Sequence, residues 1–387
     1  MTLGIIISKL FSHTSANFCY LIGRILTCLK KPKKNKYFCI SLLGDSYGDN
    51  IKPLSDYIFA NNPNAIIVWA FSKQFSGAKL CTHQKVKLYS VAYYYHMLTS
   101  KYILSNARLN QRMMHKRKGQ VYLQTWHGTA LKRLGIDVKR KRSRLEQLYN
   151  PSVFEFDVRN TDLMISGSRF MTNLYRDKFQ YQGHIVETGT PRNDIFFHDN
   201  SIIKERVRNA FQLEEGKQLI LYAPTYRSDG QYTYYNIDLK RVKGTWERKT
   251  GRSCDIMVRI HPKLQHDQHT FRQVFGRNVI DATAYPDMQE LLYACDLFIT
   301  DYSATMFDFM YTGRPVLLYT PDRAIYNRGF YFNLEELPFM VIDSNDQIDI
   351  LNSFDANDYQ QRIEAFLERI GSVESGHATE QVAKLIQ

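Results

Sequence analysis

Several common sequence signatures are missing from this chain. It has no G-x-x-x-x-G-K-[ST] segment, which excludes a P-loop, and no G-x-G-x-x-G segment, which disfavours a dinucleotide redox site. No cluster of metal ligands is visible beyond isolated aspartates. The cysteines form no C-x-x-C pair and have no zinc-ligand spacing, so we interpret them as reduced, mostly buried thiols. They are Cys19, Cys28, Cys39, Cys81, Cys254 and Cys295.

Long apolar runs are also absent, and this decides how the N-terminus is interpreted. The apolar stretch 3–29 is interrupted by Lys9, His13, Asn17 and Arg24. It therefore never reaches the roughly 18 consecutive apolar residues that a membrane-spanning helix needs. No basic leader with a small-residue cleavage site precedes it, so a cleaved secretion signal is disfavoured as well.

The pattern of this N-terminal segment predicts an amphipathic helix instead. Apolar residues recur at a three-and-four spacing that places them on one helical face. They are Phe18, Leu21, Ile22, Ile25, Leu26 and Leu29, and the lysine cluster that follows is Lys30, Lys31, Lys33, Lys34 and Lys36. We expect the segment 1–36 to lie on an anionic membrane surface, where each lysine contributes about 1 kcal/mol. The alternative is a helix packed on the chain's own core and followed by a solvated linker.

The composition is that of a folded protein with an acidic partner. Of the 387 residues, 44% are hydrophobic and 23% charged, which excludes a disordered chain, and the length suits two domains. The net charge is +13, because 51 Lys and Arg face 38 Asp and Glu. Nucleic acid, anionic lipid and a phosphorylated substrate are the partners that would account for this charge.

Alternating short apolar runs and amphipathic stretches predict an α/β fold with parallel sheets. The expected strands are 37–43, 65–71, 101–105, 121–126, 162–166, 184–188, 218–223, 255–260, 278–280, 296–300 and 315–319. They are too many for one sheet, so we predict two Rossmann-like domains facing a cleft. The expected boundaries are 37–185 for the first domain, 186–350 for the second and 351–387 for C-terminal helices.

Two histidines at predicted strand ends are the candidate catalytic residues. His127 follows the strand in Q-T-W-H-G-T, and His261 follows the strand in M-V-R-I-H-P-K together with Arg259 and Lys263. Ligands of open α/β sheets bind at the carboxyl ends of strands, so each histidine would be aimed at the cleft. An imidazole can take a proton from an attacking hydroxyl near neutral pH. Either histidine taken alone could equally be a structural one.

The segment D-L-F-I-T-D-Y-S-A-T-M-F-D-F-M-Y-T-G-R-P (296–315) predicts an anion site. A strand is followed by a helix whose free backbone N–H groups, with the hydroxyls of Ser303 and Thr305, suit a pyrophosphate. Asp308 carries a charge amid the apolar neighbours of that helix. The alternative is an ordinary capped helix.

Two arginines extend this predicted anion-binding set. Arg192 follows a strand in T-G-T-P-R-N-D, and Arg227 follows one in Y-A-P-T-Y-R. A guanidinium at a strand end offers a fork of donors to phosphate oxygens, although either arginine could be a solvated surface residue. Much of the positive charge lies instead at 30–36 and 139–144, and no groove-reading motif is present, so we expect no nucleic-acid partner.

Five motifs, taken in order, resemble the CDP-glycerol glycerophosphotransferase family of teichoic acid synthesis. They are Q-T-W-H-G-T-A-L-K-R-L-G-I-D, T-G-T-P-R-N-D, Y-A-P-T-Y-R, R-I-H-P and T-D-Y-S-A-T-M-F-D-F. G-D-S-Y-G-D-N-I-K-P-L (44–54) resembles the family's acceptor-domain segment, and the likeness spans roughly 40–345. It implies a glycosyltransferase-B-type fold whose second domain binds the donor CDP-glycerol and whose first domain binds the acceptor.

The resemblance also implies roles for residues. The implied essential histidines are His127 and His261. The implied donor-binding residues are Arg192, Arg227, Ser303 and Thr305, with Asp308 orienting the site and with Arg259 and Lys263 beside His261. No metal or other cofactor is expected. The length resembles that of the primase that adds the first glycerol phosphate to an undecaprenyl-diphosphate-linked saccharide at the cytoplasmic face of the membrane.

The resulting hypothesis is an in-line attack by an acceptor hydroxyl on the β-phosphorus of CDP-glycerol, with His127 as general base and CMP as leaving group. Two alternatives keep this chemistry, namely a poly(glycerol phosphate) polymerase and a ribitolphosphotransferase that uses CDP-ribitol for a wall or capsule polymer. Two others do not, namely a nucleotide-sugar glycosyltransferase and a non-catalytic protein that binds anionic lipid.

Overall fold

The computed structural model describes residues 3–72, 77, 81–138, 152–227, 232–261, 268–326 and 328–387. The basic cluster 139–144 and Lys263 therefore lie outside the described residues. The chain divides into two compact units. The first comprises Met1–His127, Gly135–Asp194 and Val373–Gln387, and the second comprises Gly128–Leu134 and Ile195–Ser372.

Within the described ranges, the first unit is built on a parallel sheet of seven strands in the order β3-β2-β1-β4-β5-β6-β7. The strands are β1 Lys33–Ile40, β2 Ile66–Phe71, β3 Gln84–Lys87, β4 Ser100–Ser105, β5 Val121–Gln124, β6 Leu163–Ser166 and β7 His184–Glu187. The chain order reverses between β1 and β4. Open α/β sheets bind their ligands at such a switch point, beyond the carboxyl ends of the strands.

Helices cover both faces of this sheet. They are α1 Leu3–Thr27, α2 Ile51–Asn61, α3 Val91–Thr99, α5 Val153–Asn160, α6 Arg169–Asp177 and α13 Ala378–Leu385. Side chains that alternate along β1 and β2 enter two separate cores, one shared with α2 and α13 and the other with α3. Because both faces are covered, residues 36–40 and 67–71 are buried without interruption, as is typical of parallel strands.

The second unit repeats this arrangement around a sheet whose six described strands follow the order β10-β9-β8-β11-β12-β13. The strands are β8 Gln218–Tyr222, β9 Cys254–Val258, β10 Ile280–Asp281, β11 Leu297–Thr300, β12 Val316–Tyr319 and β13 Met340–Ile342. The helices are α7 Ser201–Phe211, α8 Leu239–Thr250, α9 Gln268–Phe275, α10 Met288–Ala294, α11 Thr305–Phe309 and α12 Ala356–Ile370. The switch point lies between β8 and β11.

The predicted α/β class with parallel sheets is confirmed, and each predicted strand has a counterpart. Two strands were not predicted. β3 has the sequence Q-K-V-K and buries only Val86, because it lies at a sheet edge, and β13 has just three residues. Neither gives the run of apolar residues on which the strand predictions rest. All six cysteines are free thiols, four of them buried.

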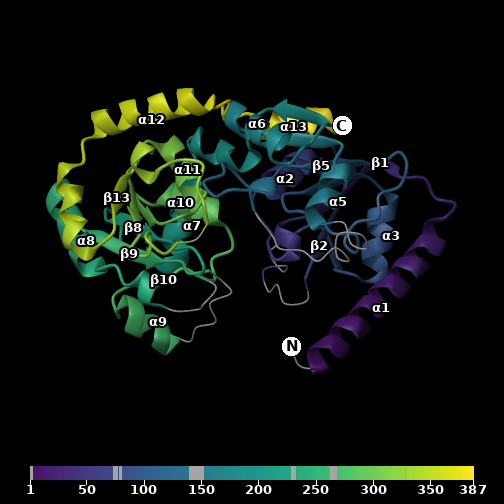
Figure 1. The fold of residues 1–387 in the computed structure, drawn as a ribbon, viewed down its shortest axis with the longest axis horizontal. Coiled ribbons are helices and arrows are strands. Elements are labelled where there is room, and N and C mark those ends of the chain that lie inside the picture. The colour runs from purple at the N-terminus through teal and green to yellow at the C-terminus, as the bar shows by residue number, and fades with distance from the viewer. Residues whose placement is uncertain are drawn as a thin grey trace. The chain divides into compact units, whose positions relative to one another are not determined.

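The division between the units differs from the predicted boundaries. The first unit continues past residue 185 to Asp194, and it also takes up the C-terminal stretch Val373–Gln387. The reason is physical: the turn 188–194 forms hydrogen bonds with residues of the first unit, and Val382, Ala383 and Ile386 of α13 enter its core. The last helix, drawn in yellow in Figure 1, is therefore part of the first unit.

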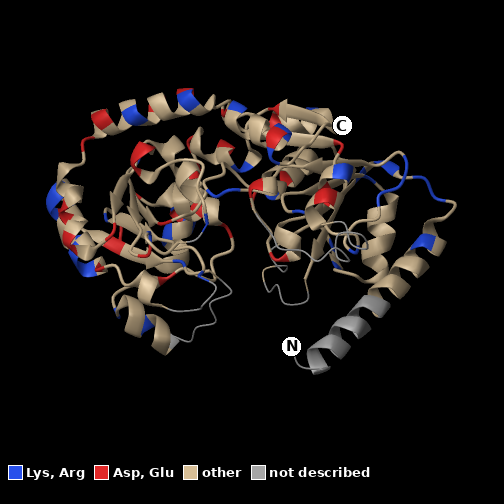
Figure 2. Ribbon diagram, in the orientation of Figure 1, with Lys and Arg blue, Asp and Glu red and all other residues tan. Residues whose placement is uncertain are grey.

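The N-terminal helix α1 has a packed face and an exposed face. Its packed face lies against α3, where Gly23 allows the helix to approach Tyr94, and Tyr20 stacks on His115 with ring centroids 3.6 Å apart. No helix in the described part of the chain is long and apolar enough to cross a bilayer. The exposed apolar residues on the other side are Phe18, Leu21, Ile25 and Leu26, and Leu29 follows the helix. Figure 2 shows Lys and Arg in the loop after α1.

Lys36 corrects the predicted basic cluster. Lys30, Lys31, Lys33 and Lys34 are exposed, but Lys36 lies in β1 and is only 4% exposed. Its Nζ donates a hydrogen bond to Thr99 Oγ1 at 2.6 Å. Burial, reinforced by the neighbouring lysines, lowers the pKa of Lys36 to about 8. Lys36 is therefore a core residue and is not available to an outer surface.

Replacing Lys36 with methionine should change how stability depends on pH. Folding lowers the pKa of Lys36 from 10.5 to about 8, so between these pH values the lysine is mostly protonated in the unfolded chain and mostly neutral in the folded protein. The free energy of unfolding of the wild type therefore rises as the pH increases through this range. The stability of Lys36→Met relative to wild type should therefore fall by up to about 3 kcal/mol from pH 7 to pH 10.5. Urea unfolding measures this, with the exposed Lys34→Met as control; a difference that does not change with pH would contradict it.

Candidate active-site elements

His127 lies in a strained turn directly after β5. Trp126, which precedes it, has a φ of +54°, and Gly128, which follows it, has a φ of +103°. The Trp126 ring stacks on the His127 ring with centroids 4.3 Å apart. A left-handed backbone conformation is unusual for tryptophan and persists only where the surrounding structure holds it. The contacts around this turn therefore fix its conformation.

The hydrogen bond of His127 determines which ring nitrogen is available. Nδ1 lies 2.9 Å from the backbone oxygen of Asn106, which follows β4. A carbonyl oxygen can only accept, so Nδ1 carries the proton and Nε2 of the neutral ring holds the lone pair. Burial lowers the pKa of His127, with the Asn106 carbonyl and Asp49 acting in the opposite direction. The neutral, base-competent form therefore predominates at pH 7.

Arg192 fixes this turn from the side. Its side chain is 5% exposed and forms an ion pair with Asp49, with NH1 2.7 Å from Oδ2. Its NH2 donates to the backbone oxygen of His127 at 2.9 Å, and its backbone N–H donates to Asn50 Oδ1 at 3.0 Å. Asn50 in turn donates to the backbone oxygen of Trp126 at 3.0 Å. The structure thus groups Arg192 with His127 in the first unit, which corrects its expected place in the donor-binding domain.

In the second unit, the predicted residues follow three adjacent strands. β9, β8 and β11 are neighbours in the sheet, and they lead into His261, Arg227 and Ser303 respectively. Their carboxyl ends meet at one edge because the strands are parallel, and the switch point lies between β8 and β11. The fold therefore brings these predicted site residues to one end of one sheet.

Arg227 is held within a buried ionic cluster. Its Nε and NH2 donate to Asp322 at 2.7 and 3.1 Å, and its NH1 lies 2.9 Å from Asp301 Oδ2 and donates to Thr225. Burial opposes its charge, but the two carboxylates outweigh burial and raise the pKa of Arg227. Tyr302 OH also donates to Asp322. The guanidinium thus uses most of its donors inside the protein, and the predicted role of Arg227 in donor binding stays a prediction.

Lys132 is the cation that this cluster leaves available. It lies in the segment Gly128–Leu134, which belongs to the second unit, and its Nζ is 5.6 Å from the centre of the Tyr326 ring. Among the residues that the structure describes, Lys132 has no hydrogen-bond or ion-pair partner. Burial lowers the pKa of Lys132 to about 8, while Asp301 acts in the opposite direction. The lysine is therefore a mostly charged donor at pH 7 that titrates just above it.

Arg259 and His261 lie beyond the end of β9. Arg259 is partly buried, and its NH1 lacks a hydrogen-bond partner in the described structure. Burial lowers the pKa of Arg259 to about 10, with Asp287 and Tyr285 acting in the opposite direction. The His261 side chain is exposed, with its ring 5.5 Å from that of Tyr226. Arg259 NH1 is therefore available to an anionic ligand, whereas the donors of Arg227 are largely taken.

The helix start after β11 differs from the predicted anion site. α11 has five residues and its N-cap, Ala304, makes no side-chain cap. The hydroxyls of Ser303 and Thr305 lie 2.7 Å apart and bond to each other. Asp308 is 1% exposed and accepts a hydrogen bond from Gln289 Nε2 at 3.0 Å, which joins α11 to α10. Asp308 therefore lies in the interior, and the two hydroxyls remain the candidate ligand contacts here.

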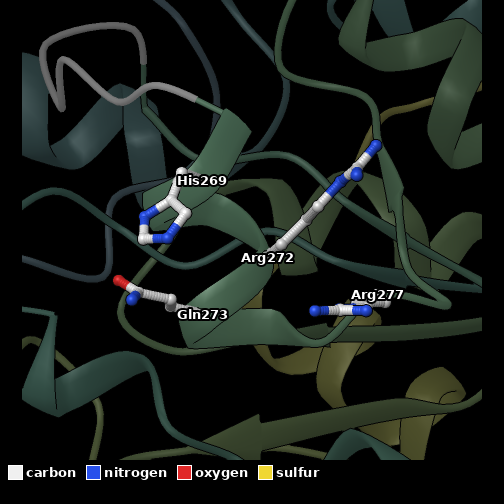
Figure 3. Close-up of a pocket in the computed structure, with 4 residues that line it drawn as sticks. All are labelled: His269, Arg272, Gln273 and Arg277. Atoms are coloured by element: carbon white, nitrogen blue, oxygen red, sulfur yellow. The ribbon is translucent and has the colours of Figure 1, made fainter.

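A separate pocket of the second unit is formed by α9 and the turn after it. Figure 3 shows His269 and Gln273, which lie one helical turn apart, together with Arg272 and Arg277. None of the predicted site residues lines this pocket. The described residues contain no group of three or more His, Cys, Asp or Glu side chains that could hold a metal ion. The pocket has no part in the candidate site.

Several residues of the candidate site have no predicted role. Asp49 and Asn50 lie within the quoted G-D-S-Y-G-D-N segment and Lys132 within H-G-T-A-L-K, so the motifs contained them without giving them roles. Asn106 and Asp322 follow β4 and β12, and the strand-end rule that led to His127 could have found them too.

Comparison with known proteins links this geometry to one family. The family model of CDP-Glycerol:Poly(glycerophosphate) glycerophosphotransferase matches residues 24–387. The teichoic acid poly(glycerol phosphate) polymerase of Bacillus subtilis (strain 168) is 30% identical over 98% of this chain and 51% of its own length. The chain thus spans about half the length of that relative. The teichoic acid glycerol-phosphate transferase of Staphylococcus aureus (strain NCTC 8325 / PS 47) is 28% identical, with 98% of each chain covered.

The same likeness holds in three dimensions. A solved structure of the wall teichoic acid polymerase TagF, soaked with CDPG, has a TM-score of 0.80 and 27% identity to this chain, and the match covers 100% of this chain and 98% of that one. The family match extends over nearly the whole chain and includes every predicted motif. This chain belongs to the CDP-glycerol:poly(glycerophosphate) glycerophosphotransferase family.

Proposed function

We propose that this chain transfers glycerol phosphate from CDP-glycerol to a hydroxyl of an undecaprenyl-diphosphate-linked saccharide in teichoic acid synthesis and releases CMP. The observation that carries the proposal is the contact of His127 Nδ1 with the Asn106 carbonyl, which leaves Nε2 of the neutral ring as the proton acceptor, in a member of this family. Such a group is what the deprotonation of an attacking alcohol requires.

The proposed step balances as a phosphoryl-group substitution. The acceptor oxygen attacks the β-phosphorus of CDP-glycerol and forms a new P–O bond. The bond between that phosphorus and the bridging oxygen breaks, and CMP leaves with the bonding electrons. The hydroxyl proton moves to Nε2 of His127. The Nδ1–H group of the ring remains hydrogen-bonded to the Asn106 carbonyl oxygen, which stabilises the imidazolium.

The donor side of the site neutralises the diphosphate. Arg259 and Lys132 have a donor or charge available at the carboxyl edge of the second sheet, where the exposed His261 also lies, and Ser303 and Thr305 add hydroxyls. Fixed cations of this kind stabilise the charge on the leaving CMP. The proposal requires the two units to act on one substrate, which is the arrangement of a glycosyltransferase-B-type fold with a cleft.

We further propose a primase-like product, in which the enzyme adds the first glycerol phosphate. The Staphylococcus aureus relative, which is matched over 98% of its length, is named a glycerol-phosphate transferase. The second candidate is a polymerase, because the Bacillus subtilis relative and the solved TagF structure carry that name. Product length on a synthetic lipid-linked acceptor separates the two, since a primase gives a single addition and a polymerase gives a ladder.

Removing the proposed base should abolish most turnover. In a CMP-release assay with CDP-glycerol, His127→Ala should lower kcat by about a hundredfold to ten-thousandfold, the usual contribution of general-base catalysis. His261→Ala should mainly raise KM for CDP-glycerol, because that side chain is on the donor side. The matched control is the exposed His184→Ala, also in the first unit, which should leave both parameters unchanged. Near-normal turnover of both His127→Ala and His261→Ala would remove the mechanism.

Lys132 should determine the alkaline limb of the pH profile. Its pKa of about 8 means that the charged form, which would hold the diphosphate, is lost as pH rises through 8. The value of kcat/KM for CDP-glycerol should therefore fall above pH 8 in wild type, whereas Lys132→Arg should keep it level and Lys132→Met should lower it about tenfold at pH 7. Lys240→Met serves as the control. A profile that is the same for lysine and arginine at position 132 would exclude this role.

We also propose that the protein is peripheral to the cytoplasmic face of the membrane, where a polyprenyl-linked acceptor is found. The support is the exposed apolar face of α1, with Phe18, Leu21, Ile25 and Leu26, followed by Lys30, Lys31, Lys33 and Lys34. Such a stripe can enter the interface while the lysines meet anionic headgroups.

Charge-matched double variants test the membrane proposal. Replacing the exposed Lys31 and Lys34 with glutamine should weaken binding to anionic vesicles by about thirtyfold, since each lysine contributes about 1 kcal/mol. Replacing the exposed Lys240 and Lys249 removes the same charge from the second unit and should change binding little. If both pairs weaken vesicle binding equally, the attachment is not made by this N-terminal segment.

A further inference from the structure

The motif T-G-T-P-R-N-D forms hydrogen bonds that have no role in the reaction proposed above. It forms the turn 188–194 after β7, and Arg192 of this turn donates to the backbone oxygen of His127. Thr190, Asn193 and Asp194 form hydrogen bonds with the C-terminal segment Val373–Gln387, which belongs to the same unit. The turn therefore lies between the candidate base and the last residues of the chain.

Glu374 binds the turn from the C-terminal side. Its carboxylate accepts hydrogen bonds from the backbone N–H of Thr190 at 3.0 Å, from the Thr190 hydroxyl and from Asn193 Nδ2 at 3.1 Å. Asn193 also donates to Thr190 Oγ1 at 2.7 Å. A single carboxylate thus holds two residues of the turn, one on each side of the Pro191–Arg192 pair. Bonds to an ionised acceptor are stronger than bonds between neutral groups.

Two glycines make room for this carboxylate. A Cβ at Gly189, where φ is +85°, would lie 2.8 Å from Glu374 Oε2, and a Cβ at Gly167 would lie 2.5 Å from Oε1. The Gly167 oxygen also accepts the backbone N–H of Val373 at 3.0 Å. The backbone around Glu374 is therefore shaped to admit a carboxylate at close range.

The opposite side of the same turn holds the His127 segment. Arg192 reaches the His127 oxygen, and its backbone N–H is held by Asn50, which also holds the Trp126 oxygen. Asp194 is the last residue of the turn and attaches it to the C-terminal segment. Its carboxylate accepts hydrogen bonds from the backbone N–H groups of Ala378 and Thr379, at the start of α13, at 3.0 and 2.7 Å. A shift of the turn would move Arg192, and with it the backbone of His127.

We propose that Glu374 is a positioning residue for His127, acting through the turn 188–194 and Arg192. The C-terminal segment is then part of the apparatus that orients the base, although it does not touch the reacting atoms. This inference rests on the proposed function of His127 as general base. It specifies which step should suffer, namely the chemical step and not the binding of CDP-glycerol.

The test is steady-state CMP release by the full chain with Glu374 replaced. Glu374→Ala should lower kcat about tenfold to hundredfold, because small misplacements of a catalytic group have effects of that size, while KM for CDP-glycerol stays within about twofold. Glu374→Gln keeps one acceptor oxygen and should give an intermediate kcat. The acidic limb of the kcat/KM profile, set by His127, should move toward the ordinary histidine pKa in the alanine variant.

Two further variants separate positioning from simple loss of structure. Glu380 lies in α13 and forms an ion pair with Lys384, and Glu380→Ala should leave kcat unchanged. Thr190→Val removes one donor to Glu374 at nearly constant volume and should lower kcat about threefold to tenfold by the same route. Thermal unfolding of every variant shows whether it is folded, and Thr190→Val and Glu374→Gln carry the test if Glu374→Ala is not.

The outcomes distinguish this inference from the proposed function. If folded Glu374→Ala and Thr190→Val keep wild-type kcat and pH profile while His127→Ala is inactive, Glu374 has no positioning role and the base assignment stands. If their loss is confined to KM for CDP-glycerol, the turn serves the donor and the inference is overturned. If His127→Ala itself is fully active, the proposed function fails independently of Glu374.

Discussion

The Arg192–Asp49 ion pair is the interaction on which the candidate base depends. The guanidinium is almost completely buried, and it reaches the backbone of His127 only because Asp49 compensates its charge. A buried ion pair contributes little net stability compared with apolar packing, but the loss of one partner costs several kcal/mol. Such a pair therefore specifies one geometry. Here that geometry includes the left-handed Trp126 and the imidazole stacked on its ring.

The second unit uses the same physics for a different purpose. Arg227 is enclosed by Asp301 and Asp322, so its charge is spent inside the protein and holds together the loops that follow β8, β11 and β12. The candidate ligand contacts lie outside this cluster: Lys132, which has no hydrogen-bond or ion-pair partner among the described residues, and Arg259 and His261 beyond β9. In both units, a buried arginine holds the loops that follow the strands, and neighbouring residues are the candidates for ligand binding and catalysis.

Most of the architecture could be predicted from the sequence, because buried parallel strands give continuous apolar runs and ligands bind at their carboxyl ends. The same rule led to His127, His261 and Arg259. It did not show that Arg192 and Arg227 form ion pairs inside the protein, since their partners Asp49 and Asp322 are distant in sequence. Lys36 was assigned to the exposed cluster because its lysine neighbours dominate the pattern, whereas its burial in β1 depends on pairing with β2 and β4.

The most direct measurement is the ¹⁵N spectrum of the His127 imidazole, followed as a function of pH in the full chain and identified by comparison with His127→Asn. If the Asn106 carbonyl and the buried Arg192 pair set this ring, the neutral form carries its proton on Nδ1 and the ring titrates below pH 6.5. A ring protonated on Nε2 in its neutral form, or one that remains an imidazolium at pH 7, would show that His127 is not held as a base.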